Sequence, residues 1–240
     1  MSIGKTLLST VFVSVLTTGC AGSPDTKPRP VEIAVDFNKP STDWTGGHSD
    51  YESGTQPDDV IVAARPLPVP FQGYGLYTAG TNRSDDLFIY IKRKFSGFIP
   101  NQDYFLTFRV TFLTDAPAGC VGVGGPPGEA VFLKAGATAT EPVTVIVDGR
   151  YQMNIDKGNQ AQGGADALTL GNIAGTNTDC NQPKFEPKTL TSSTRLRARS
   201  DAGGALWLMF GIGSGFEAAS EVYYRYATVT ASPVRSSRMN

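Results

Sequence analysis

The chain has 240 residues and a formal net charge of −1, and 18% of its residues are charged. A net charge so close to zero gives no reason to expect nucleic acid or an acidic membrane surface as a partner. With 27 glycines and 16 prolines, the composition favours short strands joined by turns over long helices. The length suits a single, well-filled all-β domain.

The first segment, residues 1–19, has the pattern of an export signal. Lys5 supplies a positive start, and an apolar run follows from Leu7 to Leu16. That run is about half as long as the roughly twenty residues that span a bilayer. It therefore predicts a cleaved signal peptide instead of a membrane helix.

The signal ends in Leu16-Thr17-Thr18-Gly19-Cys20, which resembles the lipobox of bacterial lipoproteins. In that family the signal is removed in front of the cysteine, which then receives a diacylglycerol and an acyl group. Thr17 departs from the family pattern, which usually has leucine three residues before the cysteine. The resemblance implies a lipid anchor at Cys20, and Ala21 behind it favours the outer membrane or the cell surface. The alternative is an ordinary secretory signal that is cut near Ala21.

The rest of the chain divides into a tether, a domain and a tail. Residues 20–31 are polar and rich in proline, which predicts an extended link between the anchor and the domain. The domain is expected to cover residues 32–231. Residues 232–240 lack an apolar pattern and are predicted to form a disordered tail.

The central strand pattern lies between Leu87 and Leu113. Apolar side chains alternate with polar ones in Leu87–Phe95 and again in Tyr104–Leu113, which predicts two half-buried strands. Because Gly97, Pro100 and Asn101 lie between them, we expect the two strands to form an antiparallel pair.

Shorter strand patterns flank this region. They occur at residues 32–37, 60–62, 76–80, 130–134, 143–147, 151–155, 194–199, 206–212 and 221–229. In the last segment the alternation predicts that Val222, Tyr224 and Tyr226 share one face. Residues 38–55 and 156–180 read as long loops, and loops of that length are often functional.

Two cysteines remain once Cys20 is assigned to the lipid. A pair of cysteines in an exported chain usually forms a disulfide, so we expect a bond between Cys120 and Cys180. It would close a loop of about sixty residues and stabilise the fold by roughly 4 kcal/mol in the chain-entropy estimate. The alternative is two free, buried thiols.

About ten short strands without alternating helices predict an all-β fold, a single antiparallel, jelly-roll-like β-sandwich with long loops. Three places in the chain, Phe37–Trp44, Gly97–Tyr104 and Phe216 with Tyr223-Tyr224, resemble the galactose-binding-like jelly rolls of many carbohydrate-binding modules. That resemblance implies glycan binding. The whole chain is also similar to uncharacterised bacterial lipoproteins, which implies no activity.

Several classes of site lack their motifs in this sequence. His48 is the one histidine, which excludes a metal site with several histidine ligands. No Gly-x-Ser-x-Gly motif supports acyl hydrolysis. The glycines between Gly122 and Gly128 lack the spacing of a phosphate loop, so no nucleotide is expected. These criteria identify no catalytic residue.

Residues 156–160 resemble a calcium loop only superficially. The third and twelfth positions of an EF-hand would fall on Gly158 and Ala167, and neither supplies a side-chain oxygen. A looser structural calcium site, formed by Asp156, Asp166 and Glu129, is the remaining hypothesis for a cofactor.

For a sugar ligand, the chemistry needs an aromatic face beside a few polar groups. Trp44 with His48, Asp50 and Tyr51 is the best such cluster along the chain. The alternative is that Trp44 belongs to the core.

Arg195, Arg197 and Arg199 alternate along one predicted strand. Such a row could bind an anion, but it is more often the solvated face of a strand.

We therefore predict a non-catalytic lipoprotein of the cell envelope whose domain is a glycan-binding module with an exposed aromatic platform near Trp44. The first alternative, a structural or protein-interaction lipoprotein, requires a buried Trp44 and a large exposed apolar patch. The second, a hydrolase with paired carboxylates, requires a cleft in which at least one of two carboxyl groups has a raised pKa.

Overall fold

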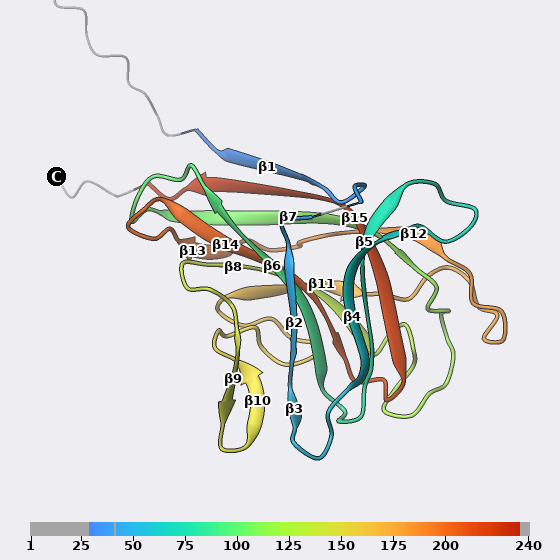
Figure 1. The fold of residues 1–240 in the computed structure, drawn as a ribbon. Coiled ribbons are helices and arrows are strands. Elements are labelled where there is room, and N and C mark those ends of the chain that lie inside the picture. Colours follow the sequence, from blue (N-terminus) through green and yellow to red (C-terminus); the bar gives the residue numbers. More distant parts are fainter. Residues whose placement is uncertain (1–28, 41, 236–240) are drawn as a thin grey trace, which may run out of the picture.

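The computed structural model describes residues 29–40 and 42–235, which form layers of β-sheet (Figure 1). These ranges contain fifteen strands and no helical residue. Consistent with this, the described part of the chain has no helix that is long and apolar enough to cross a membrane. The predicted signal, Cys20 and most of the tether lie outside the described residues, and so does the end of the predicted tail.

The larger sheet has seven strands, all paired antiparallel. Its path runs β12–β7–β15–β5–β4, while β1 pairs with β15 and β13 pairs with β7. The strands are β1 (Val31–Asp36), β4 (Asp58–Pro66), β5 (Tyr74–Thr81), β7 (Asp103–Thr114), β12 (Glu186–Thr191), β13 (Leu196–Arg199) and β15 (Ala219–Pro233).

The second sheet has five strands in the order β11–β8–β14–β6–β2, and a third sheet has the order β3–β10–β9. The strands of the second sheet are β2 (Thr45–Ser49), β6 (Leu87–Ser96), β8 (Val131–Thr138), β11 (Ala167–Asn172) and β14 (Ala205–Ser214). Those of the third are β3 (Tyr51–Glu52), β9 (Thr144–Val147) and β10 (Arg150–Met153). Figure 1 shows the third sheet at one end of the molecule.

The main core fills the space between the two larger sheets. It is built from the apolar residues that alternate along each strand, which is why the sequence pattern predicts it well. Its fully buried members include Leu87, Ile89, Ile91, Leu106, Phe108, Val110, Phe112, Leu206, Leu208, Phe210, Val222, Tyr224 and Val229. The predicted all-β, antiparallel sandwich is therefore confirmed.

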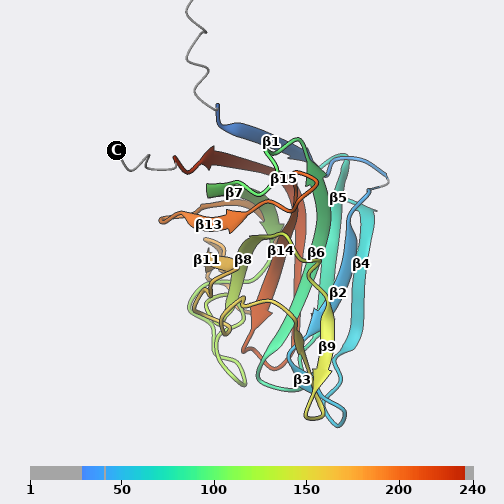
Figure 2. The ribbon, with the colours of Figure 1, turned by 90° about the vertical axis from the view of Figure 1, so that its left-hand side faces the viewer.

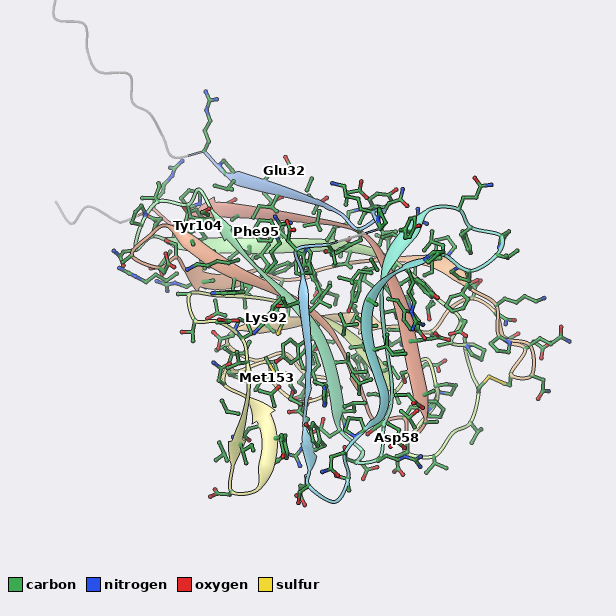
Figure 3. The ribbon with its side chains drawn as sticks, viewed as in Figure 1. Glu32, Asp58, Lys92, Phe95, Tyr104 and Met153 are labelled. Atoms are coloured by element: carbon green, nitrogen blue, oxygen red, sulfur yellow. A yellow bond between two sulfur atoms is a disulfide. The ribbon has the colours of Figure 1, made fainter. Side chains whose placement is uncertain are left out.

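A smaller apolar cluster covers the outer face of the five-stranded sheet. Phe88, Tyr90 and Met209 of that sheet pack with Met153 and Ile155 of the segment above them. Figure 3 labels Met153 on this side of the molecule. The cluster covers the part of this outer face around Phe88, Tyr90 and Met209, whereas Trp207 further along β14 is only half-buried.

The predicted pairing of Leu87–Phe95 with Tyr104–Leu113 is wrong. Both segments are strands, but β6 pairs with β14 and β2, whereas β7 pairs with β15, β12 and β13. The connection around Gly97 carries the chain from one sheet to the other. The alternation of apolar and polar residues shows which side of a strand faces the core. Two strands of one sheet have the same alternation as two strands on opposite sides of the core, so the pattern does not show which strands pair.

The predicted face of Tyr226 is also wrong, because β15 contains a β-bulge. The register pairs Tyr224 with Phe112 and then Tyr226 with Thr111, so Arg225 is the extra residue. A bulge of this kind shifts the alternation by one residue. Tyr224, before the bulge, is buried. Tyr226, after the bulge, lies on the same face as Tyr223 and is 44% exposed.

Three strands lie inside the predicted loops 38–55 and 156–180. They are β2 (Thr45–Ser49), β3 (Tyr51–Glu52) and β11 (Ala167–Asn172). The strand β12 (Glu186–Thr191) lies in a segment for which the sequence predicts no element. These strands are short, and each pairs with a single neighbour, so pairing is what orders them. The last strand ends at Pro233, two residues past the predicted end of the domain.

The predicted disulfide is present. Cys120 and Cys180 are bonded across a sequence separation of 60 residues. The bond joins the glycine-rich loop after β7 to the loop before β12, and so it fixes two long connections at one edge of the seven-stranded sheet.

Candidate ligand site on the seven-stranded sheet

Trp44 lies in the core and is 6% exposed. Its ring packs against Phe37, Phe95 and Phe210, with centroid distances of 5.3, 5.9 and 5.4 Å. The predicted aromatic platform at Trp44 is therefore wrong, and the alternative of a core residue is correct. Burial between the two sheets removes more of the large apolar ring from water than a half-exposed position would, and so it stabilises the fold more.

A hollow of about 360 Å³ reaches the edge of Trp44. It offers little to a sugar, because Arg93 lies 5.0 Å from the centre of the Phe95 ring and covers it. Arg93 is itself held by Asp43 in an ion pair of 2.9 Å.

His48, Asp50 and Tyr51 lie together where β2 leads into β3, but other parts of the protein occupy them. The Tyr51 ring stacks between His48 and Tyr151, with centroid distances of 5.3 and 4.5 Å. Asp50 is buried in an ion pair with Lys157. Burial also lowers the pKa of His48. The group therefore joins the third sheet and residues 154–166 to the sandwich.

The three residues of the calcium hypothesis do not meet. Asp156 and Asp166 are neighbours, since the Asp166 carboxylate accepts the N–H of Asp156 at 2.9 Å. Asp156 also accepts the N–H of Gly158 at 3.0 Å, whereas Glu129 accepts the N–H of Gly119 in another loop. Within the described ranges, no three carboxylate, imidazole or thiol groups are placed to share a metal.

A different set of side chains meets on the outer face of the seven-stranded sheet. Val222 and Tyr224 of β15 point into the core, so Glu221 and Tyr223 point outwards. Tyr77 of β5 is the register partner of Tyr223 and shares this face. We call the group the tyrosine–carboxylate cluster. It consists of Arg65, Tyr77, Asp115, Phe185, Glu221 and Tyr223.

The aromatic part of the cluster is continuous. The rings of Tyr77 and Tyr223 are 4.6 Å apart, and Phe185 meets Tyr223 edge-on at 5.4 Å. Arg65 lies 4.6 Å above the ring of Tyr77, which is 8% exposed. Tyr223 and Phe185 are half-buried, and Tyr226 extends the aromatic surface along the same face. Accessible ring surface is therefore supplied by Tyr223, Phe185 and Tyr226.

The polar part of the cluster is a pair of carboxyl groups. The Tyr77 hydroxyl donates to Glu221, and Asp115 and Glu221 line the same hollow. Burial, together with the charge of Glu221, raises the pKa of Asp115 to about 6. Burial and Glu221 likewise raise the pKa of Tyr77. The Asp115 carboxyl is therefore protonated below about pH 6 and charged above it.

Two shallow hollows flank Glu221. One, of about 130 Å³, is lined by Asp115, Pro117 and Pro183 beside the disulfide-linked loops. The other, of about 170 Å³, is lined by Asp59, Tyr77 and Thr81. Ser220 and Glu221 border both. The arrangement offers hydrogen-bonding groups in the centre and room on either side.

Sequence reasoning missed this cluster because its members come from five separate places between residues 65 and 223. One signal was present, since Tyr223-Tyr224 belongs to the resemblance to carbohydrate-binding jelly rolls. The alternation of β15 assigns Tyr223 to the outer face once Tyr224 is known to be buried.

Comparisons with known proteins give similarity of architecture alone. No family model matches the chain, and no curated protein matches it. The solved structures that resemble it are mostly β-sandwich domains. One is a xylan-binding domain, CBM22-1, from Paenibacillus barcinonensis, with 13% identity, 85% of this chain and 95% of that domain covered, and a TM-score of 0.36.

Two further structures are similar to the same degree. A mannan-recognising carbohydrate-binding module, TmCBM27, has 12% identity, coverage of 85% and 98%, and a TM-score of 0.36. The K3 adhesin domain of Lys-gingipain from Porphyromonas gingivalis has 13% identity, coverage of 84% and 99%, and a TM-score of 0.36. For another structure, of carbohydrate-binding modules, the chain spans 57% of the solved length. TM-scores this low describe a general shape, and the ligand of this chain does not follow from them.

Proposed function

We propose that the domain is a non-catalytic glycan-binding module and that its ligand lies on the tyrosine–carboxylate cluster. The observation that supports this most directly is the meeting of half-buried aromatic rings with a carboxyl pair on an outer sheet face. A sugar has apolar C–H faces and hydroxyl edges, so it can pack on Tyr223 and Phe185 and donate to Glu221 and Asp115. The rigid sheet fixes these groups in advance, which lowers the entropic cost of binding.

The carboxyl pair fits binding better than hydrolysis. Glycosidases hold their two carboxyl groups about 5 to 9.5 Å apart, so that a sugar carbon or a water fits between them. Asp115 and Glu221 border one small hollow, and the Tyr77 hydroxyl already occupies the Glu221 carboxylate. Burial and the neighbouring charge of Glu221 explain the raised pKa of Asp115 without an acid–base role.

The second candidate, a protein-interaction role, has partial support. Trp44 is buried, as that alternative requires. The exposed large apolar residues, however, are spread over three loops and the strands β9 and β15. They are Val69, Ile99, Val121, Val123, Ile146, Val147 and Tyr226. Scattered exposed apolar residues are normal and define no single surface.

The location is part of the proposal. We propose that the chain is exported, that Cys20 carries the lipid, and that the domain is held at the outer membrane or the cell surface. A disulfide between Cys120 and Cys180 is compatible with an oxidising compartment.

Binding to a glycan panel tests the function. The strands that the structure describes and the disulfide all lie between Val31 and Pro233, so residues 21–240 contain them. We expect this domain to bind a subset of glycans, and Tyr223→Ala to weaken binding at least tenfold by removing the packing surface. Glu221→Gln is expected to weaken it by a similar factor, because a charge-assisted hydrogen bond becomes a neutral one.

Tyr151→Ala is the matched control, since Tyr151 is also a half-buried tyrosine but stacks on Tyr51. It should leave binding unchanged. Loss of binding in Tyr151→Ala alone would move the site to the His48–Tyr51 stack. If no glycan in the panel binds, the proposal is wrong and protein partners become the leading hypothesis.

A further inference from the structure

A second surface lies far from the tyrosine–carboxylate cluster on the same sheet. Arg195, Arg197 and Arg199 are all exposed, and the buried residues Leu196 and Ala198 between them fix the three arginines on the outer face. Along β7, this surface is about 26 Å from the cluster, at about 3.3 Å for each of the eight residues from Phe105 to Leu113.

Asp103 is the carboxylate that pairs with two of these arginines. Arg197 and Arg199 lie 3.0 and 3.9 Å from Asp103, and their side chains remain 63% and 61% exposed. Arg195 lies 4.5 Å above the ring of Phe105 instead. The charge is therefore positive here, although the formal net charge of the whole chain is −1.

Arg235, two residues past the end of β15, is exposed and adds to this group. The preceding residue, Val234, donates its N–H to the carbonyl of Asp103 at 2.8 Å, so the chain leaves β15 beside these arginines. We call Arg195, Arg197, Arg199 and Arg235 the basic end.

An exposed apolar residue lies beside the basic end. Ile99 is 46% exposed, and its carbonyl accepts the hydroxyl of Ser200 at 2.6 Å. Ser200 directly follows Arg199, so the Ile99 backbone lies at the end of β13, where the row of arginines ends. Proteins bind membrane surfaces with this combination of residues. The cationic side chains contact the lipid headgroups, and the apolar side chain enters the interface.

The N-terminal segment enters the domain at the same end. Val31, Ala231, Leu106 and Leu196 are register partners in turn across β1, β15, β7 and β13. At about 4.8 Å per strand, β13 lies about 14 Å from the start of β1. Figures 1 and 2 show the start of β1 and the end of β15 at one end of the molecule. An anchor that precedes β1 would thus bring the basic end towards the membrane.

We propose that the basic end docks on an anionic lipid surface, with its arginines on the headgroup phosphates and Ile99 in the interface. The glycan site is then held at the opposite end of the sheet, away from the bilayer. Direct membrane contact goes beyond glycan recognition and does not depend on it. An unlipidated domain should therefore show the contact by itself.

Vesicle co-sedimentation of residues 21–240 tests the proposal. Vesicles of phosphatidylcholine with one third phosphatidylglycerol should bind the domain, and pure phosphatidylcholine vesicles should not. The triple variant Arg195→Gln, Arg197→Gln, Arg199→Gln should bind on the order of 100-fold more weakly at physiological salt, because each arginine near an anionic surface contributes roughly fivefold. Ile99→Ser should weaken binding several-fold, and that loss should persist when salt screens the charges.

The matched control exchanges Lys39, Arg83 and Lys184 for glutamine. These residues are also exposed, and the change in net charge is the same. If this control weakens binding as much as the arginine variant, only net charge matters and the docking surface is refuted. Equal binding to neutral vesicles, or binding to a soluble anionic polysaccharide but not to vesicles, would also overturn the proposal. The arginine variant should keep wild-type glycan binding, which shows that it folds.

Discussion

At the residue scale, Asp115 shows how position changes the chemistry of an ordinary side chain. In the sequence it is one of 22 acidic residues without a distinguishing motif. In the structure it lies against Glu221, and burial and that neighbour raise its pKa to about 6. The position that suits a sugar hydroxyl therefore disfavours the charged form of Asp115 in the empty protein.

Asp115→Asn should stabilise the domain above about pH 6. The folded state holds the Asp115 proton up to about pH 6, whereas the unfolded chain releases it near 3.8, so wild-type stability falls as pH rises between these values. The amide removes this loss, and after solvent screening we expect a gain of about 1 kcal/mol at pH 7. Urea denaturation at pH 4 and pH 7 measures it. A gain of the same size at both pH values would contradict the explanation.

Trp44 is the opposite case, a residue that the sequence singled out and that the structure assigns to packing. The hydrophobic term favours its burial because three aromatic neighbours surround it between the sheets. The residues close to Trp44 in the sequence could not reveal that its ring is buried. The decisive neighbours, such as Phe210, are far away in sequence.

At the scale of elements, the segment 154–166 is attached to the five-stranded sheet by buried lysines. Lys134 of β8 donates to the carbonyls of Lys157 and Gln162, at 3.2 and 2.7 Å, and to the hydroxyl of Thr169 at 2.9 Å. Lys157 in turn pairs with Asp50. These contacts satisfy backbone groups of the segment and explain how a glycine-rich stretch is ordered.

Lys134 should also give the stability a pH dependence at alkaline pH. Burial lowers the pKa of Lys134 from 10.5 to about 8, so between these values the unfolded chain binds a proton that the folded state does not. Stability should therefore rise with pH in this window, by about 1 to 3 kcal/mol. Lys134→Met should flatten this rise, as measured by urea denaturation from pH 8 to pH 10.5. The exposed Lys184→Met is the control, and a rise that survives in Lys134→Met would assign it to another group.

At the scale of the whole molecule, the two proposed surfaces and the predicted anchor form one arrangement. The chain enters at the basic end, and the tyrosine–carboxylate cluster lies about 26 Å further along β7. The disulfide fixes the loops beside the cluster. Such a layout would keep a glycan site clear of the bilayer while the other end contacts it.

The anchor itself can be tested in cells. We expect the wild-type protein in the membrane fraction, with a mass that corresponds to acylation of Cys20. Cys20→Ala should move most of the protein to the soluble fraction, because the basic end alone binds reversibly. Mass spectrometry and fractionation in buffer of high salt measure both effects. A wild-type protein that is cut near Ala21 without lipid would show that the resemblance to the lipobox is misleading.

The sequence by itself determined the strand segments with strong alternation, the all-β sandwich and the disulfide. These depend on local periodicity and on the small number of cysteines, both of which are visible along the chain. Only the tertiary structure decided that Leu87–Phe95 and Tyr104–Leu113 lie in different sheets, and that the bulge at Arg225 turns Tyr226 outwards. Strand pairing and register depend on contacts between residues far apart in sequence. For the same reason, the candidate site appeared only when five distant segments were brought to one face of a sheet.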